Sequence, residues 1–224
     1  MKYESIIDTV YGRLKQMIIN QEIKPGEIIN QSKLSEKLGV SRTPLRQALG
    51  ELEGEGFLGK SSRGWYAIEF TIKDMITLFE IRSLLEGLSC RKATPNMTRA
   101  DVAYLKTLME IAFEDYQKGD RDAYLKADIE FHQKIMDTAA DAILTRAINS
   151  TKVMATSHII TKSVTLLEGR YLLEPEQSYK DHLEILEAFS QKDENLAEEM
   201  MRRHIQHALQ RLREYEKLSS KKKQ

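Results

Sequence analysis

The chain has 224 residues, of which 41% are apolar and 30% charged, and its 34 basic and 34 acidic side chains leave no formal net charge. This composition is typical of a globular protein with one large or two small domains, and any binding to nucleic acid must come from a local patch of charge. The single cysteine excludes an intramolecular disulfide, and no apolar run approaches the roughly 18 residues of a membrane span, so we expect a cytoplasmic protein without a membrane segment.

The N-terminal part has the element order of a winged helix-turn-helix. Apolar spacing predicts helices over residues 5–21, 31–38 and about 41–55, separated by a KPGE turn and a Gly-Val turn. Ser41 is a suitable N-cap for the third helix. Residues 57–70 then predict two short strands around a polar loop that contains glycine.

The third helix predicts contact with DNA. Arg42 and Arg46 are four residues apart and therefore share one helix face. A guanidinium group can bind guanine or a phosphate with two hydrogen bonds. Taken alone, such a pair is usually a solvated face, but the preceding turn and the following wing favour DNA binding. The candidate DNA contacts are Ser41, Arg42, Thr43, Arg46, Lys60, Arg63 and Gly64.

A longer stretch resembles a known family. The segment NQEIKPGEIINQSKLSEKLGVSRTPLRQALGELEGEGFL is similar to the DNA-binding domain of the GntR transcription regulators. The resemblance implies a homodimer that binds a palindromic operator in double-stranded DNA, with contacts from Arg42, Arg46 and Gly64. Some members have a further arginine where this chain has Ser32. Trp65 is unusual beside the wing glycine, and we expect it to pack against the first helix.

The second half predicts an antiparallel helical bundle, so the fold class is mainly α. The expected helices cover residues 74–92, 98–118, 121–138, 141–166, 176–191 and 194–217. We therefore predict a DNA-binding domain over 1–70, a helical domain for effector binding, metal binding and dimerisation over 71–218, and a disordered basic tail over 219–224.

Four side chains of the helical domain predict a metal site. Asp128 and His132 are four residues apart on one predicted helix, and His182 and His204 lie on two later ones. Three imidazoles and a carboxylate suit zinc or nickel, and helices of a bundle can bring them together. The alternatives are a surface Asp–His pair and a solvated His182.

This half also resembles a family. This part of the chain is similar to the FCD domain of FadR-type GntR regulators in the segments EIRSLLEGLSCRKAT, DIEFHQKI and DHLEILEAFSQKDENLAEEMMRRHIQHAL. Such a bundle has six or seven helices, and the count of six expected here, rather than seven, favours the shorter VanR-like subgroup. In metal-binding members the ligands fall on Asp128, His132, His182 and His204. The resemblance also implies a small organic acid as effector, bound by Arg82, although an ion pair between Arg82 and Glu86 is equally compatible.

Three other positions have simpler expectations. His207 is interpreted as a surface histidine, and His158 could face the pocket or the solvent. Asp141 stands where many members have asparagine, and either residue caps a helix.

The function predicted from these features is a ligand-responsive DNA-binding transcription regulator with a bound divalent metal, and a repressor is favoured over an activator. A metal-sensing regulator is the first alternative. A metal-dependent hydrolase or lyase is the second, but no motif such as HExxH supplies a general base, and an enzyme has no use for paired arginines on a winged helix.

Overall fold

The computed structural model of the chain describes residues 5–68, 71–151 and 174–221. Within them the protein is mainly helical, with one two-stranded antiparallel sheet, which confirms the predicted fold class. The described residues form two compact units, one up to Thr71 and one from Ile72. Each unit is considered by itself.

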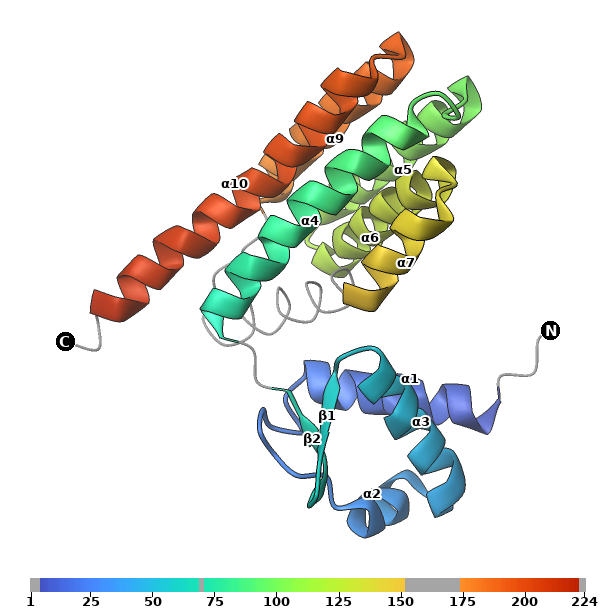
Figure 1. Cartoon of the computed structure of the whole chain (residues 1–224), viewed down its shortest axis with the longest axis vertical. Coiled ribbons are helices and arrows are strands. Elements are labelled where there is room, and N and C mark those ends of the chain that lie inside the picture. Colours follow the sequence, from blue (N-terminus) through green and yellow to red (C-terminus); the bar gives the residue numbers. More distant parts are fainter. Residues whose placement is uncertain (1–4, 69–70, 152–173, 222–224) are drawn as a thin grey trace. The chain divides into compact units, whose positions relative to one another are not determined.

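The first unit is a winged helix-turn-helix (Figure 1). Its elements are α1 (Ile6–Ile19), α2 (Gln31–Leu38), α3 (Arg42–Gly54), β1 (Leu58–Ser61) and β2 (Gly64–Ala67). The Asn30 side chain accepts a hydrogen bond from the Lys33 N–H and so begins α2. Gly39 ends it in the left-handed region at φ 68°, a conformation that costs glycine least. This tight turn directs the chain straight into α3.

The wing consists of β1 and β2 joined through Ser62 and Arg63. Lys60 pairs with Trp65 in the antiparallel register, and Ser61 pairs with Gly64. A third segment lies along β2, because the Ile29 N–H donates to the Trp65 carbonyl at 2.8 Å. The residues before α2 therefore help to fix the position of the wing.

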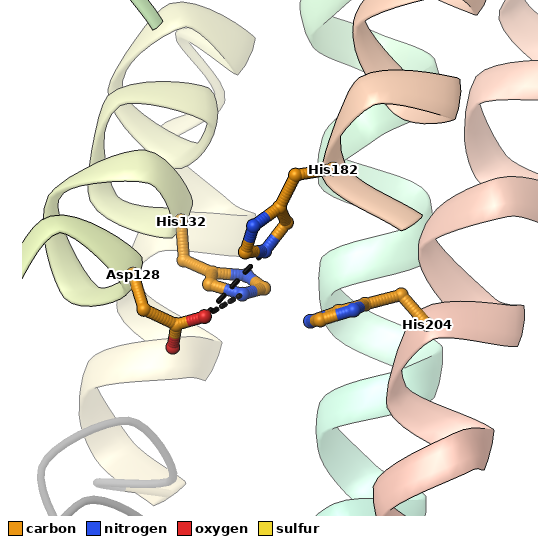
Figure 2. Close-up of side chains that lie close together, drawn as sticks. All are labelled: Asp128, His132, His182 and His204. Carbon is orange, nitrogen blue, oxygen red and sulfur yellow. Dashed lines mark ion pairs between the residues drawn. The ribbon is translucent and has the colours of Figure 1, made fainter. Parts of the chain in front are cut away.

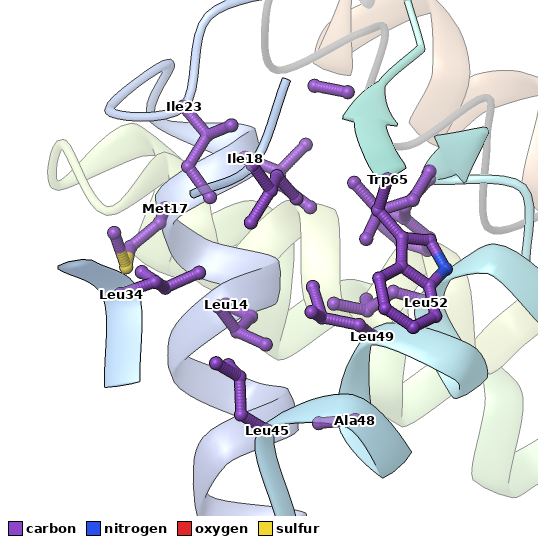
Figure 3. Close-up of a cluster of buried hydrophobic side chains, with 14 of the residues drawn as sticks. Leu14, Met17, Ile18, Ile23, Leu34, Leu45, Ala48, Leu49, Leu52 and Trp65 are labelled. Atoms are coloured by element: carbon purple, nitrogen blue, oxygen red, sulfur yellow. The ribbon is translucent and has the colours of Figure 1, made fainter. Parts of the chain in front are cut away.

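One apolar core holds these elements together (Figure 3). It contains residues from all three helices and from the wing, among them Leu14, Leu34, Leu45, Leu49, Leu52 and Trp65. Trp65 is buried in this core, with only 6% of it exposed, and its expected packing against the first helix stays a prediction. Its surroundings include α3, where Leu49 and Leu52 lie beside the indole and Glu53 accepts a hydrogen bond from the indole Nε1 at 2.6 Å.

The second unit is a helical bundle (Figure 1). Its described helices are α4 (Ile72–Ala93), α5 (Arg99–Gln117), α6 (Arg121–Ala139), α7 (Ala142–Thr151), α9 (Pro175–Gln191) and α10 (Glu194–Lys221). Helix α4 runs beside α10 in the opposite direction. It also packs on α6, while α9 contacts both α5 and α10. The helices α4, α6, α9 and α10 therefore surround a common part of the bundle interior.

The helix ends follow local sequence signals. Thr98 and Asp101 form a capping box at the start of α5. The Asp141 carboxylate accepts from the N–H groups of Ile143 and Leu144, both at 2.9 Å, so its expected capping role is confirmed. Ala140 is left-handed at φ 52° and separates α6 from α7.

Two expectations need adjustment. Helix α10 continues to Lys221, so residues 219–221 are helical and do not belong to a disordered tail. The helix expected over 141–166 is described only as far as Thr151, and the rest of it, with His158, lies outside the described residues. In the part of the chain described here, no helix is long and apolar enough to cross a membrane.

Candidate functional site

The four predicted metal ligands lie together inside the helical bundle (Figure 2). Asp128 and His132 are one turn apart on α6, His182 comes from α9 and His204 from α10. Each offers one ligand atom, and these four atoms all lie within 4.8 Å of one another. All four side chains are buried, and His182 is completely inaccessible to solvent. Both alternatives considered from the sequence, a surface pair and a solvated His182, are therefore wrong.

The donor atoms of this group fit a metal ion. The Asp128 Oδ1 lies 3.5 Å from His182 Nε2 and 4.0 Å from His132 Nε2. These two Nε2 atoms have no hydrogen-bond partner among the described residues. A buried polar atom without a partner is costly, so the arrangement calls for a bound species. Three nitrogens and one oxygen are a ligand set of zinc or nickel.

Burial also favours the metal-binding form of the histidines. It is the largest influence on His182 and His204 and lowers the pKa of both, that of His182 strongly. The neighbouring imidazoles act in the same direction. Neutral rings are the form that coordinates metals.

A buried acid on α4 contacts one of the four ligands. The sequence did not indicate that this residue lies next to the site. Glu86 places Oε2 2.5 Å from His132 Nδ1 and Oε1 2.6 Å from Arg82 Nε. Burial would raise the pKa of Glu86, but Arg82 and His132 outweigh it and hold that pKa below its usual value. The ion pair between Arg82 and Glu86 considered from the sequence is thus present.

A second buried acid, Asp181 on α9, contacts another ligand. Its Oδ2 lies 3.4 Å from His204 Nδ1 and 2.8 Å from His207 Nδ1. Burial opposes ionisation here too, yet the nearby rings of His204 and His207 lower the pKa of Asp181 to about 2. His207 is only about a third exposed, so its interpretation as a plain surface histidine is wrong. Its partner Asp181 lies on another helix, so this contact follows only from the packing of α9 against α10.

Two buried hydroxyl groups lie one helical turn before two of the ligands. Tyr124 precedes Asp128 by four residues on α6, and Ser178 precedes His182 by four on α9. Neither hydroxyl has a hydrogen-bond partner of good geometry among the described residues. Burial first, and then the Asp128 carboxylate, raise the pKa of Tyr124, so its hydroxyl keeps its proton and can donate a hydrogen bond.

The predicted DNA contacts on α3 are on the surface. Ser41, Arg42, Thr43 and Arg46 are all exposed, in or beside the first turn of the helix. Ser41 occupies the N-cap position as expected, but its side chain makes no capping hydrogen bond. Arg42 donates from Nη2 to the Ser32 hydroxyl on α2 at 2.9 Å.

The predicted contacts on the wing lie at its tip. Lys60 and Arg63 are exposed, and Gly64 begins β2 with a positive φ of 122°. The indole of Trp65 lies next to two cations, with Lys60 Nζ 4.9 Å and the Arg46 guanidinium carbon 6.0 Å from the ring centroid. Trp65 therefore contacts a predicted DNA-binding residue on the wing and another on α3.

Comparison with known families divides the chain in the same order. Residues 6–66 match the profile described as bacterial regulatory proteins, gntR family. Residues 77–207, more than half of the chain, match the FCD domain.

Individual relatives agree with this. The Nta operon transcriptional regulator of Aminobacter aminovorans is 33% identical over 60% of this chain, and the match spans 64% of that regulator, less than two thirds of its length. The gluconate operon transcriptional repressor of Bacillus licheniformis is 24% identical over 82% of this chain and 75% of its own. Among solved structures, E. coli McbR/YncC shares the fold, with a TM-score of 0.74 at 22% identity over 94% of this chain and 98% of the other.

Proposed function

The chain belongs to the GntR family of bacterial regulatory proteins and carries an FCD domain, and from this membership we propose that it is a transcription regulator controlled by a small carboxylate. The matched relatives are named as transcription regulators, which argues against the hydrolase or lyase considered from the sequence. A repressor is favoured because the gluconate operon relative is one.

The DNA-binding half of the proposal is carried by the exposed face of α3. The helix begins with free N–H groups that can bind a phosphate. Arg42 and Arg46 follow on one face, beside Ser41 and Thr43. We assign these residues to the major groove and the wing residues Lys60, Arg63 and Gly64 to the backbone or minor groove. A homodimer would place two such helices on a palindromic operator.

The effector half rests on the buried group of Asp128, His132, His182 and His204, which we assign to a divalent ion, zinc or nickel. When bound, the ion supplies a positive centre that attracts a carboxylate. Within the described residues Arg82 bonds Glu86 through Nε, which leaves its terminal nitrogens for the effector carboxylate and would give a bidentate contact. The relative from Bacillus licheniformis is named for the gluconate operon, and gluconate is a sugar acid, which agrees with a carboxylate effector. We also propose that the chain belongs to the VanR-like subgroup.

The two halves are connected by linkage. An effector changes DNA affinity only as far as it binds one arrangement of the domains more tightly than another. Because the half-sites of an operator are fixed by the DNA period, a small change in the spacing of two α3 helices weakens binding.

The observation that carries the proposal is the exposed start of α3 in a chain that also holds a buried group of potential metal ligands. The test is selection of random double-stranded DNA by the purified full chain, followed by affinity measurements with and without organic acids. Enrichment of a palindrome whose affinity changes with one acid is expected. Recovery of unenriched DNA would contradict the DNA-binding proposal, and constant affinity across the acids would contradict the effector.

A metal-sensing regulator remains the second candidate, since the four side chains alone can supply the four ligands of a tetrahedral ion without an effector. Rapid exchange of the ion, with DNA affinity that follows metal concentration, would favour it. An ion that does not exchange favours a permanent role in the effector pocket.

A further inference from the structure

We propose that Glu86 and Asp181, here called the outer carboxylates, determine the metal affinity of the site by fixing His132 and His204. The inference rests on the metal binding proposed above. Neither residue belongs to the group of four ligands, and both are 2% exposed.

Each outer carboxylate lies next to Nδ1 of its histidine, which leaves Nε2 of that ring for the ion. Glu86 lies at Nδ1 of His132, whose Nε2 faces Asp128. Asp181 lies at Nδ1 of His204, whose ring points edge-on toward the other ligands (Figure 2). A carboxylate that accepts from Nδ1–H keeps the proton there and leaves the lone pair of Nε2 for the ion.

Each outer carboxylate also joins two helices. Glu86 is on α4 and its histidine on α6, while Asp181 is on α9 and its histidine on α10. The ring orientation is therefore set by the packing of two rigid elements, which is how a site keeps its geometry before the ion arrives.

Both outer carboxylates are themselves held in place. Glu86 bonds Arg82 through its other oxygen at 2.6 Å. Asp181 accepts from Gln177 Nε2 at 2.9 Å and bonds His207 at 2.8 Å. Since neither can rotate into solvent, each remains at its histidine.

His182 differs from the other two histidines. Its contact with a carboxylate is made through Nε2, to Asp128 Oδ1 at 3.5 Å, and its ring packs on Phe131 with centroids 4.2 Å apart. Packing orients this ring, so the outer carboxylates act on two of the three imidazoles.

The test compares zinc affinity and the cobalt(II) absorption spectrum of the full chain in Glu86→Gln, Asp181→Asn and Glu187→Gln. Glu187 is an exposed acid on the same helix as Asp181 and serves as the matched control. We expect each outer variant to lose about 10- to 100-fold in zinc affinity. We also expect their cobalt spectra to shift, because a neutral amide permits the other tautomer, whereas Glu187→Gln should match the parent protein.

Circular dichroism of the metal-free variants separates this effect from unfolding. If Glu86→Gln does not fold because Arg82 loses its partner, Asp181→Asn carries the test, since His207 and Gln177 can still bond the amide. If the folded variants keep the metal affinity and the cobalt spectrum of the parent protein, the role of the outer carboxylates is overturned, and the metal site itself is not. A parent protein that binds neither zinc, nickel nor cobalt overturns this inference together with the metal site.

Discussion

The guanidinium carbon of Arg46 lies 6.0 Å from the ring centroid of Trp65, which connects α3 to the wing. The same ring is 4.9 Å from Lys60 Nζ. A cation beside an aromatic ring gains about 0.5–1 kcal/mol at exposed sites, and the ring itself is fixed in the core and by Glu53. The indole thus restricts two side chains assigned to DNA.

The first prediction concerns this indole. Trp65→Phe keeps an aromatic face, whereas Trp65→Leu removes it, so we expect Leu to weaken operator binding more than Phe. Both lose the bond to Glu53, which makes Phe the control for that loss. Fluorescence anisotropy on a fixed DNA fragment measures the difference, and thermal unfolding checks that both variants are folded. Equal affinities would show that the ring only fills the core.

The second prediction concerns how α3 reads DNA. Arg42→Ala or Arg46→Ala should cost about 1–3 kcal/mol of discrimination between operator and altered operator if the arginine contacts a base. A loss that is uniform over all sequences, with a smaller dependence on salt, would assign it to a phosphate. Arg13→Ala, an exposed arginine on α1, is the matched control.

The third prediction concerns Ser32, which accepts a hydrogen bond from Arg42. Ser32→Arg should introduce a second cation beside α3 and release Arg42 from that bond. We expect tighter binding whose salt dependence steepens by about one unit of slope, the value of one added phosphate contact. A titration of affinity against salt concentration tests it. An unchanged slope would place residue 32 away from the DNA backbone.

The fourth prediction concerns removal of the metal. If the ion binds only the folded helical unit, a free concentration 100 times its Kd adds about 2.7 kcal/mol to the free energy of unfolding. A chelator should therefore lower the melting temperature of the parent protein. His132→Ala and His204→Ala should lower metal content and reduce this sensitivity, while the first unit stays folded. Parent-like metal content in both variants would remove these ligands from the site.

The fifth prediction concerns the carboxylate effector. In a thermal-shift screen with metal present, an organic acid that raises the melting temperature of the parent protein should do so less in Arg82→Lys. Lysine keeps the charge opposite Glu86 but lacks the planar fork that binds a carboxylate twice. The metal-loaded stability of each protein without acid is the baseline. An undiminished response would leave Arg82 with only its structural bond to Glu86.

Local signals predicted most of the fold. Periodicity, caps and turns act over a few residues, so Asn30, Gly39 and Asp141 marked helix ends correctly. The end of α10 at Lys221 was missed because a lysine- and serine-rich end carries no apolar spacing. The contact of Trp65 with Glu53 was missed because the two residues lie on different elements.

The sequence by itself determined the winged helix-turn-helix, the helical bundle and the identity of Asp128, His132, His182 and His204 as possible ligands. Only the tertiary structure decided that these four are buried within 4.8 Å of one another. It alone assigned Glu86 to His132 and Asp181 to His204 and His207. The physical reason is distance along the chain: a helix presents its own neighbours at three and four residues, but contacts between helices depend on how their buried faces pack.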